Sequence, residues 1–185
     1  DPVVLTALCC HEPVAVLARL RMSNSDLARA TALVAGPVEP ASGTTRDGTL
    51  HFSDKIAWPI TPFVGTLGVA PDREVTTSID GQGEWGGNLD IRDAAPGNRI
   101  YLPIHHPGAL FYLGDVHASQ GDTEFTGTAA ETKSTVRVKL DLIKGKRTPW
   151  MRIEKPESIV SVYAYRPLEV AVEIATINLI DWMVT

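Results

Sequence analysis

Four side chains that can bind a metal ion or move a proton follow one apolar stretch of the sequence. Residues 109–113 (Ala-Leu-Phe-Tyr-Leu) have the length and composition of a buried strand. Asp115 and His117 come directly after it, and because side chains alternate along an extended chain, both point to the same face. Asp122 and Glu124 follow a glycine that can turn the chain, and they again share a parity. One imidazole with several carboxylates at a strand end indicates a divalent-metal site or a general acid–base site.

A second group of polar side chains lies in the glycine-rich segment 81–90. Asn88 and Asp90 end this segment, and its glycines allow the backbone to approach a site closely. Asp90 can serve such a site or stabilise a turn, and Asn88 can orient a substrate or cap the turn. Glu131 follows a further apolar stretch, where a buried carboxylate needs a partner, so we interpret it as a group that orients His117.

Strands must position these groups, and the sequence predicts strands along most of the chain. Apolar runs and apolar–polar alternation predict them at 3–8, 14–22, 49–52, 99–103, 109–113, 124–130, 135–143 and 158–164. Asp47-Gly48 predicts a hairpin turn, and the prolines of 59–62 place that segment at a sheet edge or in irregular structure. Residues 25–29 can open a short helix, and Pro167 begins a longer, largely apolar one. We therefore expect a β-rich α+β protein with mostly antiparallel, sandwich-like sheets and a single C-terminal helix packed on the sheet.

Composition and charge exclude several classes of partner. The chain has 185 residues, a formal charge of −5 and no cluster of basic residues, which argues against nucleic-acid binding. No apolar run approaches the roughly 18 residues of a membrane span, and no signal-peptide pattern is present. Cys9 and Cys10 are adjacent, so they are poorly placed to bridge each other and suit a reducing compartment. We expect a cytoplasmic protein with no nucleic-acid or membrane partner.

Three stretches of the sequence together resemble the acetamidase/formamidase family. They are residues 62–71 (Pro-Phe-Val-Gly-Thr-Leu-Gly-Val-Ala-Pro), residues 86–90 (Gly-Gly-Asn-Leu-Asp) and residues 108–124, of which the last is the most specific. The resemblance implies a β-rich, often oligomeric enzyme that binds metal and hydrolyses short aliphatic amides to a carboxylate and ammonia. On this basis we expect a family-like core over 61–185 preceded by a β-rich segment over 1–60, or one continuous domain.

The resemblance decides between two interpretations of the polar groups. From the residues alone, Asp115 and His117 can simply form a hydrogen-bonded strand end. With the resemblance, we expect Asp90, Asp115 and His117 to hold a divalent metal, for which zinc suits the mixture of carboxylate and imidazole ligands. Glu124 is expected to act as the general base, with Asp122 as its alternative. A formamide- or acetamide-like substrate and a homo-oligomer follow from the same resemblance.

Two departures from the family pattern keep other functions open. Thr123 stands where the family has a glycine, and a positive φ there would strain a β-branched side chain. The segment upstream of the core is also shorter than in the family. One alternative is therefore a divergent member that catalyses a cyclisation or proton transfer in secondary metabolism. The other is a non-catalytic binding protein, or a fragment that lacks an N-terminal segment.

Overall fold

Antiparallel strands form most of the regular secondary structure among the described residues. The computed structural model describes residues 3–7, 27–34, 39–40, 44–46, 48–74, 81–125 and 127–185. Each described strand pair is antiparallel. The elements in chain order are β1 (Val3–Ala7), β2 (Leu27–Val34), β3 (Glu39–Pro40), β4 (Thr44–Arg46), β5 (Thr49–His51), β6 (Ala57–Pro59), β7 (Phe63–Gly68), β8 (Gln82–Gly83), β9 (Gly86–Asn88), β10 (Arg99–Pro103), β11 (Tyr112–His117), the 3₁₀-helix η1 (Asp122–Glu124), β12 (Thr132–Ile143), β13 (Arg152–Glu154), β14 (Ile159–Ser161) and the helix α1 (Leu168–Val184).

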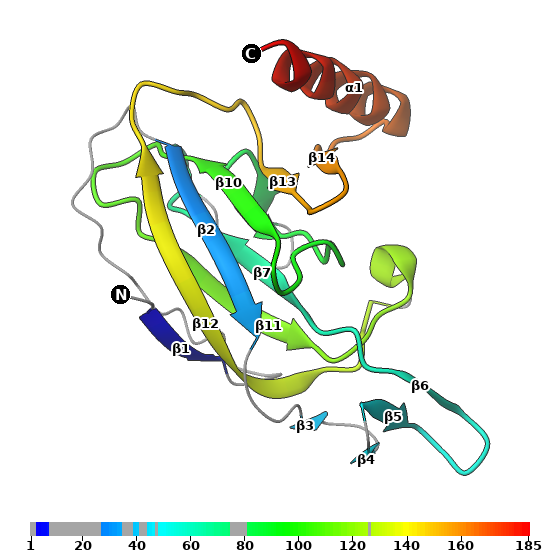
Figure 1. Cartoon of the computed structure of the whole chain (residues 1–185). Coiled ribbons are helices and arrows are strands. Elements are labelled where there is room, and N and C mark those ends of the chain that lie inside the picture. Colours follow the sequence, from blue (N-terminus) through cyan, green and yellow to red (C-terminus); the bar gives the residue numbers. More distant parts are fainter. Residues whose placement is uncertain are drawn as a thin grey trace.

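Two sheets form the body of the molecule, and a small third sheet extends from one end (Figure 1). The largest sheet has the strand order β1-β12-β2-β10-β13-β14, with β3 also pairing with β12. The second sheet, β11-β7-β9-β8, crosses behind β2 and β12. The third sheet is β4-β5-β6, in which β6 is an edge strand, as the prolines of 59–62 predict. β4 and β5 pair antiparallel on either side of the predicted hairpin turn, of which Asp47 lies outside the described residues.

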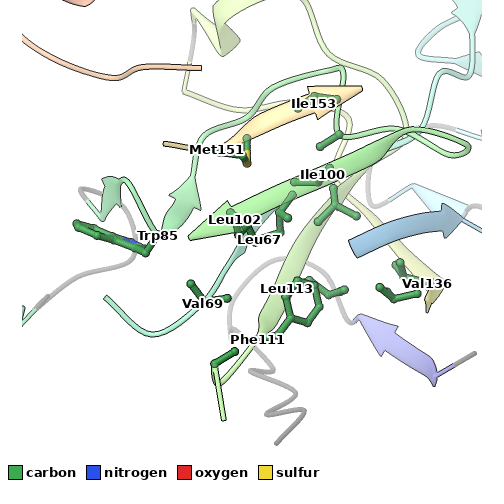
Figure 2. Packing of buried hydrophobic residues seen from close by; sticks show 14 of the residues in the cluster. Leu67, Val69, Trp85, Ile100, Leu102, Phe111, Leu113, Val136, Met151 and Ile153 are labelled. Atoms are coloured by element: carbon green, nitrogen blue, oxygen red, sulfur yellow. The ribbon is translucent and has the colours of Figure 1, made fainter. Parts of the chain in front are cut away.

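Buried apolar side chains fill the space between the two larger sheets (Figure 2). On β12, Val136 and Val138 are fully buried, whereas Arg137 and Lys139 on the opposite face are exposed. The alternation predicted for 135–143 is therefore confirmed, and each buried valine contributes roughly 1.5–3 kcal/mol to folding. The same core holds β7 and β11 in place, and the polar groups lie where these two strands run side by side.

The structure corrects two predicted elements near the polar groups. The strand predicted over 109–113 is right only at its end and begins later, as β11, because Ala109 and Leu110 have left-handed φ values of 54° and 53°, outside the regular β region. The strand predicted over 124–130 is replaced by η1 and an irregular segment, of which residue 126 lies outside the described residues. Apolar composition identified these segments as ordered, but it carried no information about backbone handedness.

The N-terminal part of the chain corrects another prediction. The short helix expected at 25–29 is wrong, because Leu27 begins β2, which pairs with β10 on one side and β12 on the other. Ladder hydrogen bonds from two neighbouring strands outweigh a weak local preference for helix. The strand predicted at 14–22 lies outside the described residues. The domain boundary between residues 60 and 61 stays a prediction.

The C-terminal helix α1 lies at the β13–β14 edge of the large sheet (Figure 1). Pro167 directly precedes it, as predicted, and it is the one α-helix among the described residues. Arg152 of β13 attaches it: Nη2 donates to the carbonyl of Asn178 and lies 3.1 Å from Asp181 Oδ2. The guanidinium also lies over the ring of Trp182. The predicted fold class, mostly antiparallel sheets with a single C-terminal helix, is therefore confirmed.

Much of α1 remains exposed in the single chain. Its exposed apolar side chains are Leu168, Val172, Ile177, Ile180, Met183 and Val184. A helix that is apolar on all sides is usually buried, and the homo-oligomer that the family resemblance implies stays a prediction. Within the described part of the chain, none of the helical structure has the length and apolarity that crossing a membrane requires.

The attachment of α1 yields a stability prediction. We expect Arg152→Met to lower the free energy of unfolding by about 1–3 kcal/mol, because the substitution removes a buried guanidinium with three partners. The matched control is Arg99→Met, since Arg99 on β10 also pairs with a carboxylate, that of Glu154, but is half exposed. Exposed pairs contribute about 0–1 kcal/mol. Urea unfolding followed by circular dichroism measures both, and equal losses would contradict the role of Arg152.

Candidate functional site

A local distortion where β7 pairs with β11 creates the site. The register pairs Gly114 with Thr66 and Val116 with Val64, and it skips Asp115 and the glycine opposite. Asp115 has a φ of 57°, in the left-handed region that residues other than glycine seldom adopt. The left-handed backbone of Asp115 thus lies at the break in this register, and it sets the direction in which the Asp115 carboxylate leaves the strand.

Gly65 leaves the space into which two carboxylates turn. A Cβ atom on Gly65 would lie 2.6 Å from Asp90 Oδ1 and 2.8 Å from Asp115 Oδ2, closer than real Cβ contacts allow. Asp90 itself is anchored to this glycine, because its N–H donates to the Gly65 carbonyl over 3.0 Å. The close approach at Gly65 brings together two segments 25 residues apart in sequence.

The structure gathers most of the predicted site residues around one imidazole. Asp90, Asp115 and His117 each offer a ligand atom, and these atoms all lie within 4.8 Å of one another. His117 also forms such a group with Glu124 and Glu131. His117 therefore belongs to both groups, and the carboxylates of four residues surround its side chain.

Asp122 is not brought into this cluster. Its carboxylate lies 2.6 Å from Arg92 Nη2, and its side chain is 80% exposed. The two residues of η1 separate because a 3₁₀-helix has three residues per turn, which sets Asp122 and Glu124 about 120° apart around the axis. The shared parity predicted for them on an extended backbone is therefore wrong. Glu124, the last residue of this turn, has a φ of 45°, and the strain expected at Thr123 stays a prediction.

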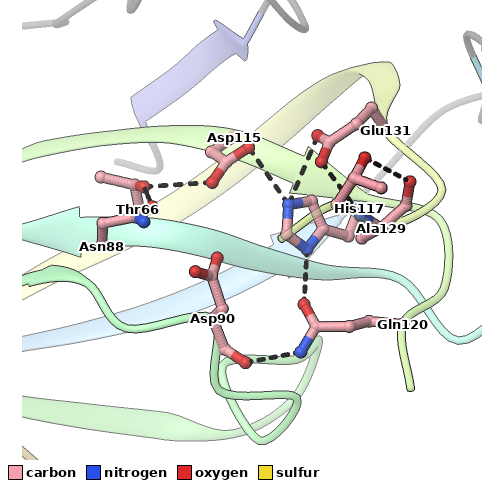
Figure 3. A network of polar contacts seen from close by, with 9 residues as sticks. Thr66, Asn88, Asp90, Asp115, His117, Gln120, Ala129 and Glu131 are labelled. Carbon is pink, nitrogen blue, oxygen red and sulfur yellow. Dashed lines mark hydrogen bonds and ion pairs between the residues drawn. The ribbon is translucent and has the colours of Figure 1, made fainter. Parts of the chain in front are cut away.

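His117 is fully buried and is held on several sides (Figure 3). Its Nε2 atom lies 3.1 Å from Asp115 Oδ1 and 3.3 Å from Glu131 Oε2. Its ring meets that of Phe63 edge-on, with centroids 4.9 Å apart. Glu131 therefore contacts His117 as predicted, but at the nitrogen that faces the cluster rather than at the far one.

The electrostatics of the cluster favour a cation at this nitrogen. Burial lowers the pKa of His117, but its contacts with Asp115 and Glu131 outweigh burial and raise that pKa to about 10. Burial raises the pKa of Asp115, but its hydrogen bond to His117 and further contacts lower it overall. Burial, together with the charges of Glu124 and Asp115, raises the pKa of Asp90 to about 7. In the absence of a metal, a proton on His117 thus supplies the positive charge that these carboxylates require.

Asn88 acts on the site through a neighbour. The Thr66 hydroxyl donates to Asn88 Oδ1 and lies 3.2 Å from Asp115 Oδ2 (Figure 3). Asn88 lies on β9, the strand that pairs with β7 on the side opposite β11. Asn88 is thus linked to the Asp115 carboxylate through the Thr66 hydroxyl. Its contact helps to hold Thr66 beside that carboxylate.

Sequence reasoning missed Gln120 and Thr66. Gln120 is buried, and its side chain contacts both His117 and the backbone of Asp90. Its position three residues after His117 was visible, but its second partner lies 30 residues away in the sequence. Thr66 was visible only as a polar residue within a glycine-rich apolar stretch. Neither role has a local signal, because each depends on how separate strands pair.

Comparisons with known proteins give a consistent result. The model of the Acetamidase/Formamidase family matches residues 76–167, which include Asp90, Asp115, His117, Glu124 and Glu131. An acetamidase of Mycolicibacterium smegmatis is 39% identical over 90 residues, which are 44% of this chain and 22% of that protein. A formamidase of Methylophilus methylotrophus is 40% identical over 60 residues, which are 32% of this chain and 15% of that protein.

A solved structure supports the same assignment over most of the chain. The crystal structure of an acetamidase from Yersinia enterocolitica superposes with a TM-score of 0.78 at 31% identity, covering 89% of this chain and 59% of that one. This chain therefore spans about a fifth of the length of the curated relatives and less than two thirds of the length of the Yersinia acetamidase. Both the sequence motifs and the fold agree, and the chain belongs to the acetamidase/formamidase family.

Proposed function

We propose that this chain hydrolyses a short aliphatic amide, such as formamide or acetamide, to a carboxylate and ammonia, with a divalent metal at Asp90, Asp115 and His117. The observation that carries the proposal is the convergence of the Asp90 and Asp115 carboxylates with a fully buried imidazole, since their ligand atoms all lie within 4.8 Å of one another. The names of the relatives, acetamidase and formamidase, support amides as the substrate class.

The residues present fit a bound divalent cation. Among the described residues, Asp90 Oδ1 is buried and has no hydrogen-bond partner, a costly arrangement unless a cation completes it. Two carboxylates and one imidazole are a ligand set that zinc accepts in catalytic sites, and we propose zinc for this reason. A divalent ion bound there polarises an amide carbonyl and makes water acidic enough to lose a proton near neutral pH.

The remaining groups of the site then have distinct tasks. Glu124 reaches the cluster from η1, and we assign it the proton of the attacking water. As the C–O bond forms and the C–N bond breaks, Glu124 passes this proton to the leaving nitrogen, which departs as ammonia. Glu131 holds His117 in place, while Thr66 and Asn88 hold Asp115. Asp122, the alternative base, only secures η1 through its contact with Arg92.

The two carboxylates of η1 provide a matched test of this assignment. With ammonia release from formamide and acetamide as the assay, we expect Glu124→Gln to lose about 10²–10⁴-fold in kcat. Asp122→Asn removes an exposed ion pair and is expected to cost at most about fivefold. Equal losses, or a larger loss in Asp122→Asn, would exclude Glu124 as the base. Turnover of a substrate without ammonia would instead support a cyclisation or proton transfer.

A further inference from the structure

The far side of the His117 ring is held by a buried amide side chain. Gln120 Oε1 lies 2.9 Å from His117 Nδ1, and Gln120 Nε2 donates to the backbone carbonyl of Asp90 over 2.9 Å. Gln120 is 7% exposed, so water does not readily replace either partner. Figure 3 shows Gln120 between the imidazole ring and the Asp90 backbone, on the side of the ring away from Asp115 and Glu131.

The orientation of this amide follows from its second partner. The Asp90 carbonyl can only accept a hydrogen bond, so the NH₂ group of Gln120 must face it. The oxygen of Gln120 therefore faces His117 Nδ1, and that nitrogen must carry a proton to donate. When Nδ1 holds the proton of a neutral ring, Nε2 presents a bare lone pair, which is the form that binds a metal ion.

Gln120 also joins two of the proposed ligands. The backbone of Asp90 is fixed on both sides, because its N–H donates to Gly65 and its carbonyl accepts from Gln120. Asp90 has a φ of 50°, so its position depends on such contacts. One side chain thus sets the ring of His117 and the location of the Asp90 carboxylate together.

We infer that Gln120 is a positioning residue, which keeps the proton of His117 on Nδ1 and ties Asp90 to the ring, so that Nε2 and the Asp90 carboxylate face a bound cation. The inference rests on the proposed function for the identity of the cation, but the hydrogen bond itself is independent of it. Residues that orient a ligand in this way commonly change metal affinity 10–100-fold when they are replaced.

The test compares Zn²⁺ affinity and the His117 ring proton in the full chain and its variants. Gln120→Leu keeps the approximate volume and removes both hydrogen bonds, whereas Gln120→Glu keeps an acceptor for Nδ1–H. Gln82→Leu is the matched control, because Gln82 is the other glutamine of the chain and is exposed on β8. Competition with a chromophoric chelator gives the affinity. NMR of ¹⁵N-histidine-labelled protein gives the Nδ1 proton, assigned by its absence in His117→Asn.

We expect Gln120→Leu to bind Zn²⁺ about 10–100-fold more weakly and to lose the slowly exchanging Nδ1 proton. Gln120→Glu should lose less affinity and retain that proton, and Gln82→Leu should match the unmodified chain. Zinc binding by Gln120→Leu within about twofold of the unmodified chain, or an unchanged Nδ1 proton, would overturn the inference. If the unmodified chain binds no zinc, the proposed function fails. The exchange rate of the Nδ1 proton then decides the role of Gln120, because the positively charged metal-free ring carries this proton in each variant.

Discussion

His117→Asn is expected to abolish both zinc binding and amide hydrolysis. His117 supplies the nitrogen ligand in each group of potential metal ligands among the described residues, and the shorter asparagine side chain cannot carry a nitrogen to the same position. We therefore expect the affinity for Zn²⁺ to fall by more than about 100-fold, beyond the usual effect of replacing a residue that merely orients a ligand. Equilibrium dialysis with metal analysis measures the binding, and ammonia release measures the activity.

Two further variants separate loss of the ligand from loss of the fold. His117 is fully buried against Phe63, so its replacement also destabilises the core. Asp115→Asn keeps the volume and removes only a charge, and we expect it to weaken zinc binding while circular dichroism remains unchanged. His106→Asn is the control, because His106 is exposed and contacts the Pro71 carbonyl. A folded His117→Asn protein that binds zinc like the unmodified chain would remove His117 from the site.

Gly65→Ala is expected to destroy the site by adding one methyl group. The new Cβ would lie 2.6 Å from Asp90 Oδ1, 2.8 Å from Asp115 Oδ2 and 2.9 Å from the Asp115 backbone carbonyl. The side chains can rotate away only by leaving the cluster, and the carbonyl cannot move without breaking the β7–β11 register. We expect loss of measurable zinc binding and a fall of about 1–3 kcal/mol in the free energy of unfolding.

Gly114→Ala is the matched control for this substitution. Gly114 lies on β11 next to Asp115, but a Cβ atom there would meet nothing within 4 Å. The variant should retain zinc binding and gain up to about 1 kcal/mol of stability, because alanine restricts the unfolded chain. Isothermal titration calorimetry and thermal unfolding measure the two quantities. Similar zinc affinities in Gly65→Ala and Gly114→Ala would mean that the Asp90 and Asp115 carboxylates do not hold the metal together.

The parts of the fold that were predictable from sequence are those governed by local alternation. On β12, apolar and polar residues alternate with the period of a strand, and the burial of Val136 and Val138 follows directly. Pro167 similarly identified the start of α1. The segments 109–113 and 124–130 were not predictable in this way, because left-handed backbone at Ala109, Leu110 and Glu124 interrupts an otherwise strand-like composition.

The candidate site was likewise predictable only where it depends on local spacing along one strand. The spacing of Asp115 and His117 placed both on one strand, and their contact of 3.1 Å agrees with that expectation. The approach of Asp90 was only one of two open interpretations, since it depends on the pairing of β7 with β9 and β11. Gln120 could not be found, because its function needs a carbonyl from the Asp90 segment. The parts of the site that the sequence did not predict therefore depend mostly on contacts between strands that are distant in the sequence.

The most direct test is to titrate the metal-free full chain with Zn²⁺ and to measure bound metal and ammonia release from formamide and acetamide at each addition. We expect ammonia release to rise in proportion to bound zinc and to level off when one ion is bound per chain, with Asp115→Asn showing neither at the same concentrations. Ammonia release that is independent of added metal, or zinc binding that is unaffected in Asp115→Asn, would contradict a metal-dependent amidase centred on Asp90, Asp115 and His117.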